Sequence, residues 1–305
     1  MKLKKYIITL ILTVFFTSAF CKDLEKEYSL TVDAAFYPLQ LRGEGRGTLS
    51  MAFKIPTPLG DQALLESANL NIKLNLEITP VSFSPQAVLA FEPLPFLAFE
   101  SGAKIGTGGN FRSTKGMAVF NGSDDYISLK SFSHWFTHFY FQGTFKFDTG
   151  AIFEGDWNHF QLMYTYQVYY SALTGLDDDQ IWKWQSTMNR ANGWQNYQSL
   201  ILAYQMPLVL SRVGVLSELE GHYKDSDYNP DLYGNFKGSF KTISISPVLQ
   251  FTFADEAHTL SLLFSFSSRR RFAEEYTNPA TEPLLTYTGR EWFFNRIAMS
   301  WAMKF

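Results

Sequence analysis

Apolar and polar residues alternate with a period of two along several long segments of the chain. The clearest segment has one wholly aliphatic and one wholly polar set of alternate positions: Leu70, Ile72, Leu74, Leu76 and Ile78 against Asn71, Lys73, Asn75 and Glu77. Because successive side chains of a β-strand point to opposite faces, this pattern predicts a strand with one apolar and one polar face. A soluble protein can contain one such strand, so the number and length of the repeats must decide the class.

The alternation recurs at residues 133–147, 157–170, 239–253 and 258–270. These segments run for about 10 to 15 residues, whereas strands of globular proteins average about 5 to 6 and tilted membrane strands need about 9 to 11. Their length therefore favours an antiparallel transmembrane β-barrel. The composition agrees, because aromatic residues reach 17% while charged residues make up only 18%, below the usual value of about 25%.

The N-terminus has the pattern of a secretory signal peptide. Lys2, Lys4 and Lys5 precede an apolar run at residues 6–16, which is too short to span a bilayer as a helix. We expect a signal peptide at 1–21, cleaved after Ala19 or Cys21, and a barrel at 22–305. A lipoprotein, acylated on Cys21, is the alternative, although the bulky Phe20 disfavours it. The mature chain is then mildly acidic, which argues against a nucleic-acid partner.

The last strand carries a more specific signal. Alternate positions from residue 293 onward are apolar except for one asparagine: Phe293, Asn295, Ile297, Met299, Trp301, Met303 and Phe305. This final amphipathic strand resembles the C-terminal signature of bacterial outer-membrane proteins. The resemblance implies an outer-membrane location and recognition of Trp301, Met303 and Phe305 by the barrel-insertion machinery.

Thirteen segments read as strands, and even strand numbers are the rule in bacterial single-chain barrels. They are 28–38, 46–56, 67–79, 83–93, 95–106, 115–130, 133–147, 157–170, 197–209, 210–224, 239–253, 258–270 and 290–305. The segment at 115–130 is broken by polar residues, so we discard it and predict twelve strands, with ten and fourteen as alternatives. Pro247 lies inside a strand pattern and predicts either a bulge or a shifted register.

The alternation also predicts which polar side chains face the lumen. The pore-lining candidates are Asn71, Lys73, Asn75, Glu77, Lys104, Lys146, Arg212, Glu218, Glu220, His222, Arg296 and Lys304. Both signs of charge occur among them. A hydrated channel and a network of ion pairs that plugs the barrel are equally good interpretations at this stage.

Other polar and aromatic clusters have ordinary explanations. We interpret Asp177–Asp179 as a solvated loop in preference to a calcium site, and Arg269–Arg271 as a strand end at the polar interface. Trp182, Trp184 and Trp194 could stack on sugars, but an interfacial aromatic belt accounts for most such residues. No histidine is followed by serine two positions later, and Ser131-Phe132-Ser133-His134 and Asn189-Arg190 are the nearest hints of a barrel lipid hydrolase.

The sequence therefore predicts a porin-like channel for small polar solutes, without an enzymatic activity, a cofactor or a metal site. Its expected partners are outer-membrane lipid, the insertion machinery and small solutes. A plugged structural or adhesin barrel with surface-exposed loops is the first alternative, and an outer-membrane lipid hydrolase is the second.

Overall fold

The computed structural model of the 305-residue chain describes residues 25–111, 114–122, 126–224, 228–253, 257–275 and 284–305. The expected signal peptide at 1–21 and both candidate cleavage sites lie outside these residues. Among the described residues, no helix combines the length and the apolar character that a membrane-spanning helix requires.

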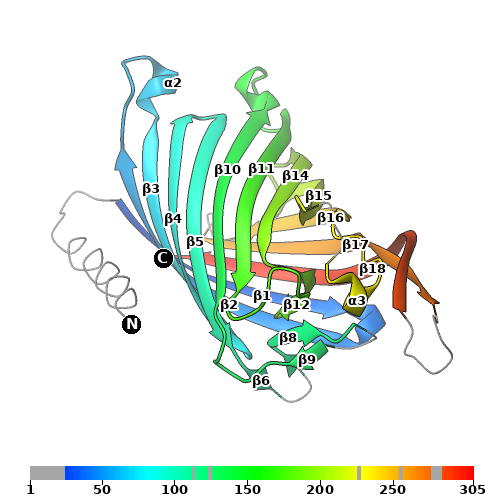
Figure 1. Ribbon diagram of the computed structural model, residues 1–305. Coiled ribbons are helices and arrows are strands. Elements are labelled where there is room, and N and C mark those ends of the chain that lie inside the picture. Colours follow the sequence, from blue (N-terminus) through cyan, green and yellow to red (C-terminus); the bar gives the residue numbers. More distant parts are fainter. Residues whose placement is uncertain (1–24, 112–113, 123–125, 225–227, 254–256, 276–283) are drawn as a thin grey trace, which may run out of the picture.

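Twelve antiparallel strands form a closed barrel in the order β1-β18-β17-β16-β15-β14-β11-β10-β5-β4-β3-β2 (Figure 1). Their bounds are β1 (Glu25–Tyr37), β2 (Arg42–Pro56), β3 (Asn69–Thr79), β4 (Ser82–Leu94), β5 (Leu97–Gly108), β10 (Phe136–Asp148), β11 (His159–Leu173), β14 (Gly193–Gln205), β15 (Leu210–His222), β16 (Thr242–Phe253), β17 (His258–Glu275) and β18 (Leu284–Lys304). Pairing of β1 with β18 closes the barrel, with Val32 opposite Trp301. The predicted fold class and the predicted number of strands are confirmed.

Two strands are longer than the alternation predicts. The strands β17 and β18 contain 18 and 21 residues and pair with each other beyond the rim formed by their neighbours. Two shifts of register interrupt this pairing, one between Ser265 and Phe266 and one between Arg271 and Phe272. Bulges of this kind break a period-two pattern, which explains why the sequence alone underestimates both strands.

The outer face of the barrel is apolar over its whole circumference. Large hydrophobic side chains exposed on it include Val32, Leu49, Leu89, Phe99, Phe139, Phe141, Leu202, Ile297 and Trp301. Closure satisfies the backbone hydrogen bonds of every barrel strand, so the polypeptide can cross a bilayer without unpaired backbone groups. The exposed belt then meets acyl chains.

Pro247 causes no bulge. Ile245 pairs with Phe266 and Val248 pairs with Leu263, which is the same register on both sides of the proline. On its other side, Pro247 pairs with Val215. The ladder to β17 is interrupted at the proline, as expected for a residue without an N–H group, and the alternation of β16 continues unchanged.

The two ends of the barrel differ in the length of their connections. At the end where β1 begins and β18 ends, which we call the turn end, connections include the tight turns at 95–96 and 206–209. The short helix α2 (Ala63–Glu66) and the 3-10 turn η2 (Thr149–Ala151) also lie there. At the opposite end, the loop end, β1 and β2 are joined through η1 (Pro38–Gln40), whereas the connections at 109–135, 174–192 and 223–241 are long.

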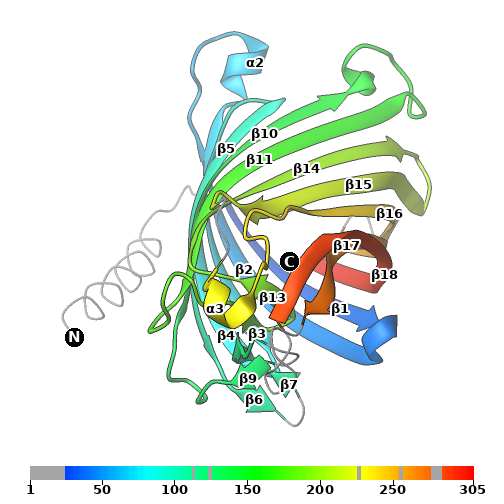
Figure 2. The ribbon, with the colours of Figure 1, turned by 45° about the vertical axis from the view of Figure 1, so that its right-hand side comes forward.

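The long connections fold into a small sheet of their own. The strands β8 (Met117–Phe120), β9 (Tyr126–Ser128), β12 (Trp182–Trp184) and β13 (Thr187–Arg190) pair in the order β13-β12-β8-β9, which we call the inner sheet. The inner sheet and the short helix α3 (Pro230–Tyr233) gather at the loop end, opposite α2 (Figures 1 and 2). A two-stranded hairpin, β6 (Asn110–Phe111) with β7 (Thr114–Lys115), lies at the same end. The segment that we discarded from the barrel therefore does form strands, but they belong to the inner sheet.

Two apolar clusters hold the inner sheet together. Met117, Leu173, Trp182 and Trp184 form the first, and Phe120, Ile181, Ala191, Tyr228, Tyr233 and Phe236 form the second, around α3. Burial of an aromatic side chain stabilises a fold by about 1.5 to 3 kcal/mol, so these clusters make the loop end a folded unit.

Candidate functional site

The predicted pore-lining side chains lie on barrel strands at positions that alternation turns inward. Asn71, Lys73, Asn75 and Glu77 are on β3, Lys104 on β5, Lys146 on β10, Arg212, Glu218, Glu220 and His222 on β15, and Arg296 and Lys304 on β18. Six of them lie in the half of the barrel nearer the loop end: Glu77, Lys104, Glu218, Glu220, His222 and Arg296. Whether any of them lines a conducting path stays a prediction.

The others form separate contacts towards the turn end. Lys146 pairs with Glu92 at 3.2 Å, and Lys304 pairs with Glu27 at 3.5 Å. Arg212 donates to the side-chain oxygens of Gln250 and Gln205 at 3.3 and 3.4 Å. These groups are therefore not brought together with the charged cluster at the loop end.

Glu77 is the centre of the first contact between the barrel wall and the inner sheet. Its carboxylate accepts from the Nζ of Lys104 at 2.9 Å and from the guanidinium of Arg46 at 3.3 Å. Gln185, between β12 and β13, donates to Glu77 at 3.1 Å and to Ser82 at 2.7 Å. The loop end is thus tied to β3 and β4 through a carboxylate whose charge two cations balance.

Arg190 makes the second contact, on another part of the wall. Its guanidinium lies 2.8 Å from the carboxylate of Glu220 and also donates to Tyr169 and Gln195 at 2.5 and 2.7 Å. Burial alone would lower the pKa of Arg190, but the Glu220 carboxylate and Tyr169 raise it above its ordinary value. Arg190 therefore remains charged and binds β13 to β11, β14 and β15.

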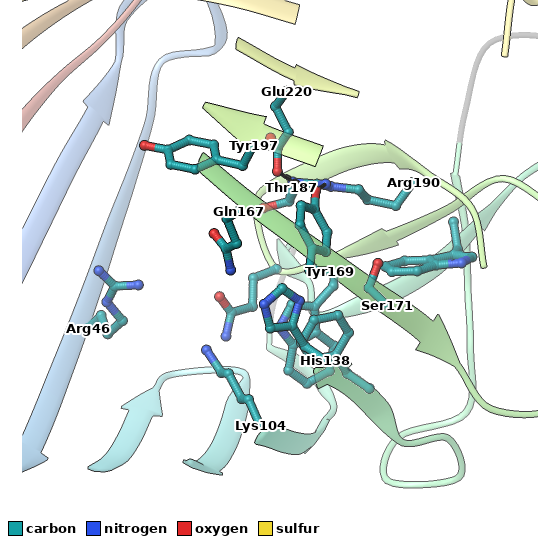
Figure 3. Close-up of a pocket in the computed structure, with 14 residues that line it drawn as sticks. Arg46, Lys104, His138, Gln167, Tyr169, Ser171, Thr187, Arg190, Tyr197 and Glu220 are labelled. Carbon is teal, nitrogen blue, oxygen red and sulfur yellow. Dashed lines mark hydrogen bonds and ion pairs between the residues drawn. The ribbon is translucent and has the colours of Figure 1, made fainter. Parts of the chain in front are cut away.

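A cavity of about 300 Å³ lies between these two contacts. Figure 3 shows Arg46 and Lys104 on one side of it and Tyr169, Arg190 and Glu220 on the other. Its wall also includes His138, Gln167, Thr187 and Tyr197, with Trp182, Trp184 and Phe136 at its apolar edge. Charged, amide and phenolic groups dominate the remainder, so the cavity suits water and polar solutes.

A second cavity of about 350 Å³ also lies beside β13. Five arginines contribute to its wall: Arg42, Arg190, Arg269, Arg270 and Arg296. It shares Thr187, Arg190, Tyr197 and Glu220 with the first cavity. The two cavities therefore adjoin beside β13 and the wall formed by β14 and β15.

Sequence reasoning missed Arg46, Gln185 and Arg190. Arg46 shares the alternate positions of Arg42 and Glu44 on β2, and this alternation could have identified it. Gln185 and Arg190 lie in the connection between β11 and β14, where no periodic pattern applies. Only the folded inner sheet brings them to the barrel wall.

The interpretation of Trp182 and Trp184 as belt residues is wrong. Trp182 is fully buried in the inner sheet and donates its indole N–H to Asn192 at 2.9 Å. Trp184 stacks on Phe136 with 4.9 Å between ring centroids. Trp194, by contrast, is 52% exposed on the outer face of β14, as an interfacial residue would be.

The interpretation of Arg269–Arg271 as a strand end is also wrong, because β17 continues to Glu275. Arg269 forms an ion pair with Glu291, while Arg270 lies over the Phe236 ring at 4.3 Å. Arg270 also donates to the carbonyl of Lys237 at 3.1 Å. Arg270 therefore joins the β17–β18 hairpin to the loop around α3, whereas Arg269 pairs within the hairpin.

Two other polar groups were considered in the sequence, the acidic run at Asp177–Asp179 and the Ser133–His134 pair. Among the residues that the structure describes, including Asp177–Asp179, no three histidine, cysteine or acidic side chains are grouped to hold a metal. Ser133 Oγ lies 2.7 Å from Nδ1 of His134 on an exposed loop. Whether this pair has any hydrolytic role stays untested by the geometry.

The residues of the expected insertion signal lie at the turn end. Trp301 is exposed on the outer face, Met303 pairs with Leu30 and His258, and Phe305 is 75% exposed. Their recognition by the insertion machinery stays a prediction.

No known family profile and no curated protein matches the sequence. Solved structures similar to the chain include the β domain of the Bordetella autotransporter BrkA, with 8% identity, a TM-score of 0.43, and 92% of this chain and 100% of that one covered. The outer membrane channel DcaP of Acinetobacter baumannii has 10% identity and a TM-score of 0.36 over 93% and 97% of the two chains. Outer membrane phospholipase A from Escherichia coli has 11% identity and a TM-score of 0.34 over 92% of both. TM-scores below 0.5 do not establish a relationship, so the class of this protein is assigned from its own barrel.

That barrel is closed, it exposes an apolar belt, and its polar groups face inward. Only closed barrels and helices can cross a membrane with every backbone group satisfied. The chain is a bacterial outer-membrane β-barrel protein. This confirms the outer-membrane location and the protein class that the sequence of the final strand predicts. The activity of the protein is considered below.

Proposed function

We propose that this barrel is a porin-like channel that passes small polar solutes along the wall beside β13. The observation that carries the proposal is the pair of polar cavities beside this strand, which share Thr187, Arg190, Tyr197 and Glu220. Charged and hydroxyl groups in both cavities favour a hydrated route. Because bacterial barrels place long loops outside the cell, the loop end would be the entrance.

The inner sheet would act as the constriction of this channel. Two of its contacts with the wall are polar, at Glu77–Gln185 and at Glu220–Arg190, while its apolar contact with Phe136 lies at the loop-end start of β10. Water enters a polar contact more readily than an apolar one, because the polar groups can form hydrogen bonds with the water in place of those with each other. The proposed pore is therefore narrow, hydrated and modest in conductance.

Single-channel recording tests the proposal. The purified protein is refolded, its folding is checked by heat-modifiable migration on a gel, and it is then added to a planar bilayer. We expect discrete, reproducible conductance steps. A fully folded preparation that inserts and yields no steps would reject the channel.

A plugged structural or adhesin barrel is the second candidate. The feature that favours it is the folded loop end, with Trp182, Ile181 and Tyr233 fully buried. Two results together would establish it. The folded protein would show no conductance, and it would bind a host or polysaccharide surface only while the inner sheet is present.

We further propose that the protein is not an enzyme and uses no cofactor. The hydrogen bond between Ser133 and His134 is the feature that would argue for a lipid hydrolase. Mass spectrometry of outer-membrane phospholipids after incubation with the refolded protein tests this, and product formation that Ser133→Ala abolishes would overturn it. The proposed partners are outer-membrane lipid, the barrel-insertion machinery and small solutes, without nucleic acid.

A further inference from the structure

The larger of the two cavities, at about 350 Å³, contains the guanidinium group of Arg296 in its wall. Arg296 of β18 donates to the phenol oxygen of Tyr37 at 3.4 Å. Among the described residues, no carboxylate lies within ion-pair distance of Arg296. A half-buried cation without a counter-ion is costly, so this position favours an anion from solution.

Arg42 contacts the ring of the same tyrosine. Its guanidinium carbon is 5.0 Å from the centre of the Tyr37 ring, and Tyr37 pairs with Arg42 across the β1–β2 ladder. Glu44 accepts from Arg42 at 2.8 Å and from the hydroxyl of Tyr37 at 3.1 Å. Arg42 and Arg296 thus both contact Tyr37, Arg42 over the ring and Arg296 at the hydroxyl, while the carboxylate of Glu44 binds Arg42 and the same hydroxyl.

Neutral hydrogen-bonding groups extend this row along the wall. Ser267 and Ser244 lie 2.8 Å apart, and Asn295 donates to Ser267 at 3.2 Å. All three line the same cavity as Arg42 and Arg296. Hydroxyl and amide donors beside two guanidinium groups are the kinds of group that bind phosphate and carboxylate oxygens.

The cavity has room for such a ligand. A volume of about 350 Å³ corresponds to about twelve water molecules at roughly 30 Å³ each, which is more than a phosphate or a short carboxylate requires. Arg190 balances Glu220 at 2.8 Å, and Glu218, which accepts from the phenol of Tyr197 at 2.8 Å, keeps its negative charge, but the wall contains five arginines against these two carboxylates. A solute in the cavity therefore meets the arginines as its strongest available partners.

We infer that Arg42, Tyr37 and Arg296 form a subsite for a small phosphate or carboxylate anion inside the barrel. The inference rests on the proposed function for its physiological meaning, since it names the class of solute that the channel would prefer. Binding itself does not require conduction. The two statements can therefore fail separately.

Two measurements test the subsite, with inorganic phosphate as the probe. The first is the reversal potential in a gradient of potassium chloride across a bilayer of phosphatidylcholine, which contains no anionic lipid headgroup, followed by block of the current with phosphate. The second is calorimetric titration of phosphate into the refolded protein in zwitterionic detergent. Low ionic strength is used because salt screens these charges. For the wild type we expect anion preference, block and binding.

Arg296→Gln and Arg42→Gln are the informative variants, and Arg212→Gln is the matched control. Arg212 loses the same charge from the inner face, but near the turn end and outside the cavity. Losing one charge-assisted contact should weaken phosphate binding about tenfold in each cavity variant, and leave the control within about twofold of the wild type. Heat-modifiable migration verifies that every variant is folded.

The outcomes separate the two proposals. Equal losses in Arg212→Gln and Arg296→Gln, or wild-type behaviour of both cavity variants, would overturn the subsite. Phosphate binding without any conductance would retain the subsite and reject the channel. Conductance steps with neither anion preference nor phosphate binding would retain the channel and reject the subsite.

Discussion

The guanidinium of Arg190, on the inner strand β13, lies 2.8 Å from the carboxylate of Glu220 on the barrel strand β15. The pair is largely shielded from solvent and is completed by Tyr169 and Gln195. Because removing one member of a buried pair leaves the other without compensation, this contact determines whether the inner sheet stays docked on the wall.

Arg190→Ala should open the barrel. Breaking a fully buried pair costs about 3 to 5 kcal/mol; this half-buried pair costs less, and the cost falls on docking of β13 while the ladder of the barrel is untouched. We therefore expect a larger and noisier single-channel conductance with unchanged heat-modifiable migration. Arg212→Ala is the control, since Arg212 bonds only to amide side chains near the turn end. Unchanged conductance in Arg190→Ala would show that β13 does not limit the pore.

Trp182→Ala should unfold the inner sheet and spare the barrel. The side chain is fully buried and donates to Asn192, and truncation of a buried aromatic typically costs about 3 to 5 kcal/mol. Faster protease cleavage within residues 174–192, and faster hydrogen exchange there, should follow. Trp194→Ala supplies the control because that ring is on the outer face. Equal protection in the two variants would contradict an independent inner unit.

Trp182 and Trp194 show which side-chain positions can be predicted from the sequence and which cannot. Trp194 belongs to a barrel strand, so its outward face follows from alternation. Trp182 lies only twelve positions earlier, but its burial depends on pairing with Val119, across a connection that has no period. The strand number and the inward face of Glu77 or Glu220 could be predicted because each barrel strand repeats one local rule. The partners Gln185 and Arg190 could not, since they reach the wall through the folding of distant loops.

Gly102→Val should destabilise the barrel itself. Gly102 of β5 pairs with Tyr140 of β10, and a Cβ atom at Gly102 would stand 2.3 Å from the Tyr140 ring. Tyr140 is buried and hydrogen-bonded to Glu100, so it has no easy alternative position. Overpacking of this kind costs about 1 to 3 kcal/mol, and the gel transition between folded and unfolded forms should occur at a lower temperature.

Gly143→Val is the matched control for that change. Gly143 lies on the same pair of strands, but a Cβ atom there would come no closer than 3.9 Å to the Phe99 ring. We expect its transition temperature to stay near that of the wild type. An equal drop in both variants would indicate loss of strand flexibility in place of a clash with Tyr140.

Replacing residues 177–190 with a short Gly-Ser linker should convert the constricted barrel into a wider pore. The change removes β12 and β13, together with both contacts to the wall, at Glu77 through Gln185 and at Glu220 through Arg190. The remaining ladder between β11 and β14, where Ser171 pairs with Gly193, is kept. We expect a several-fold increase in conductance and faster uptake of larger hydrophilic solutes by vesicles. If the shortened protein inserts and conducts as the wild type does, the inner sheet is not the constriction, and the path must run elsewhere along the wall.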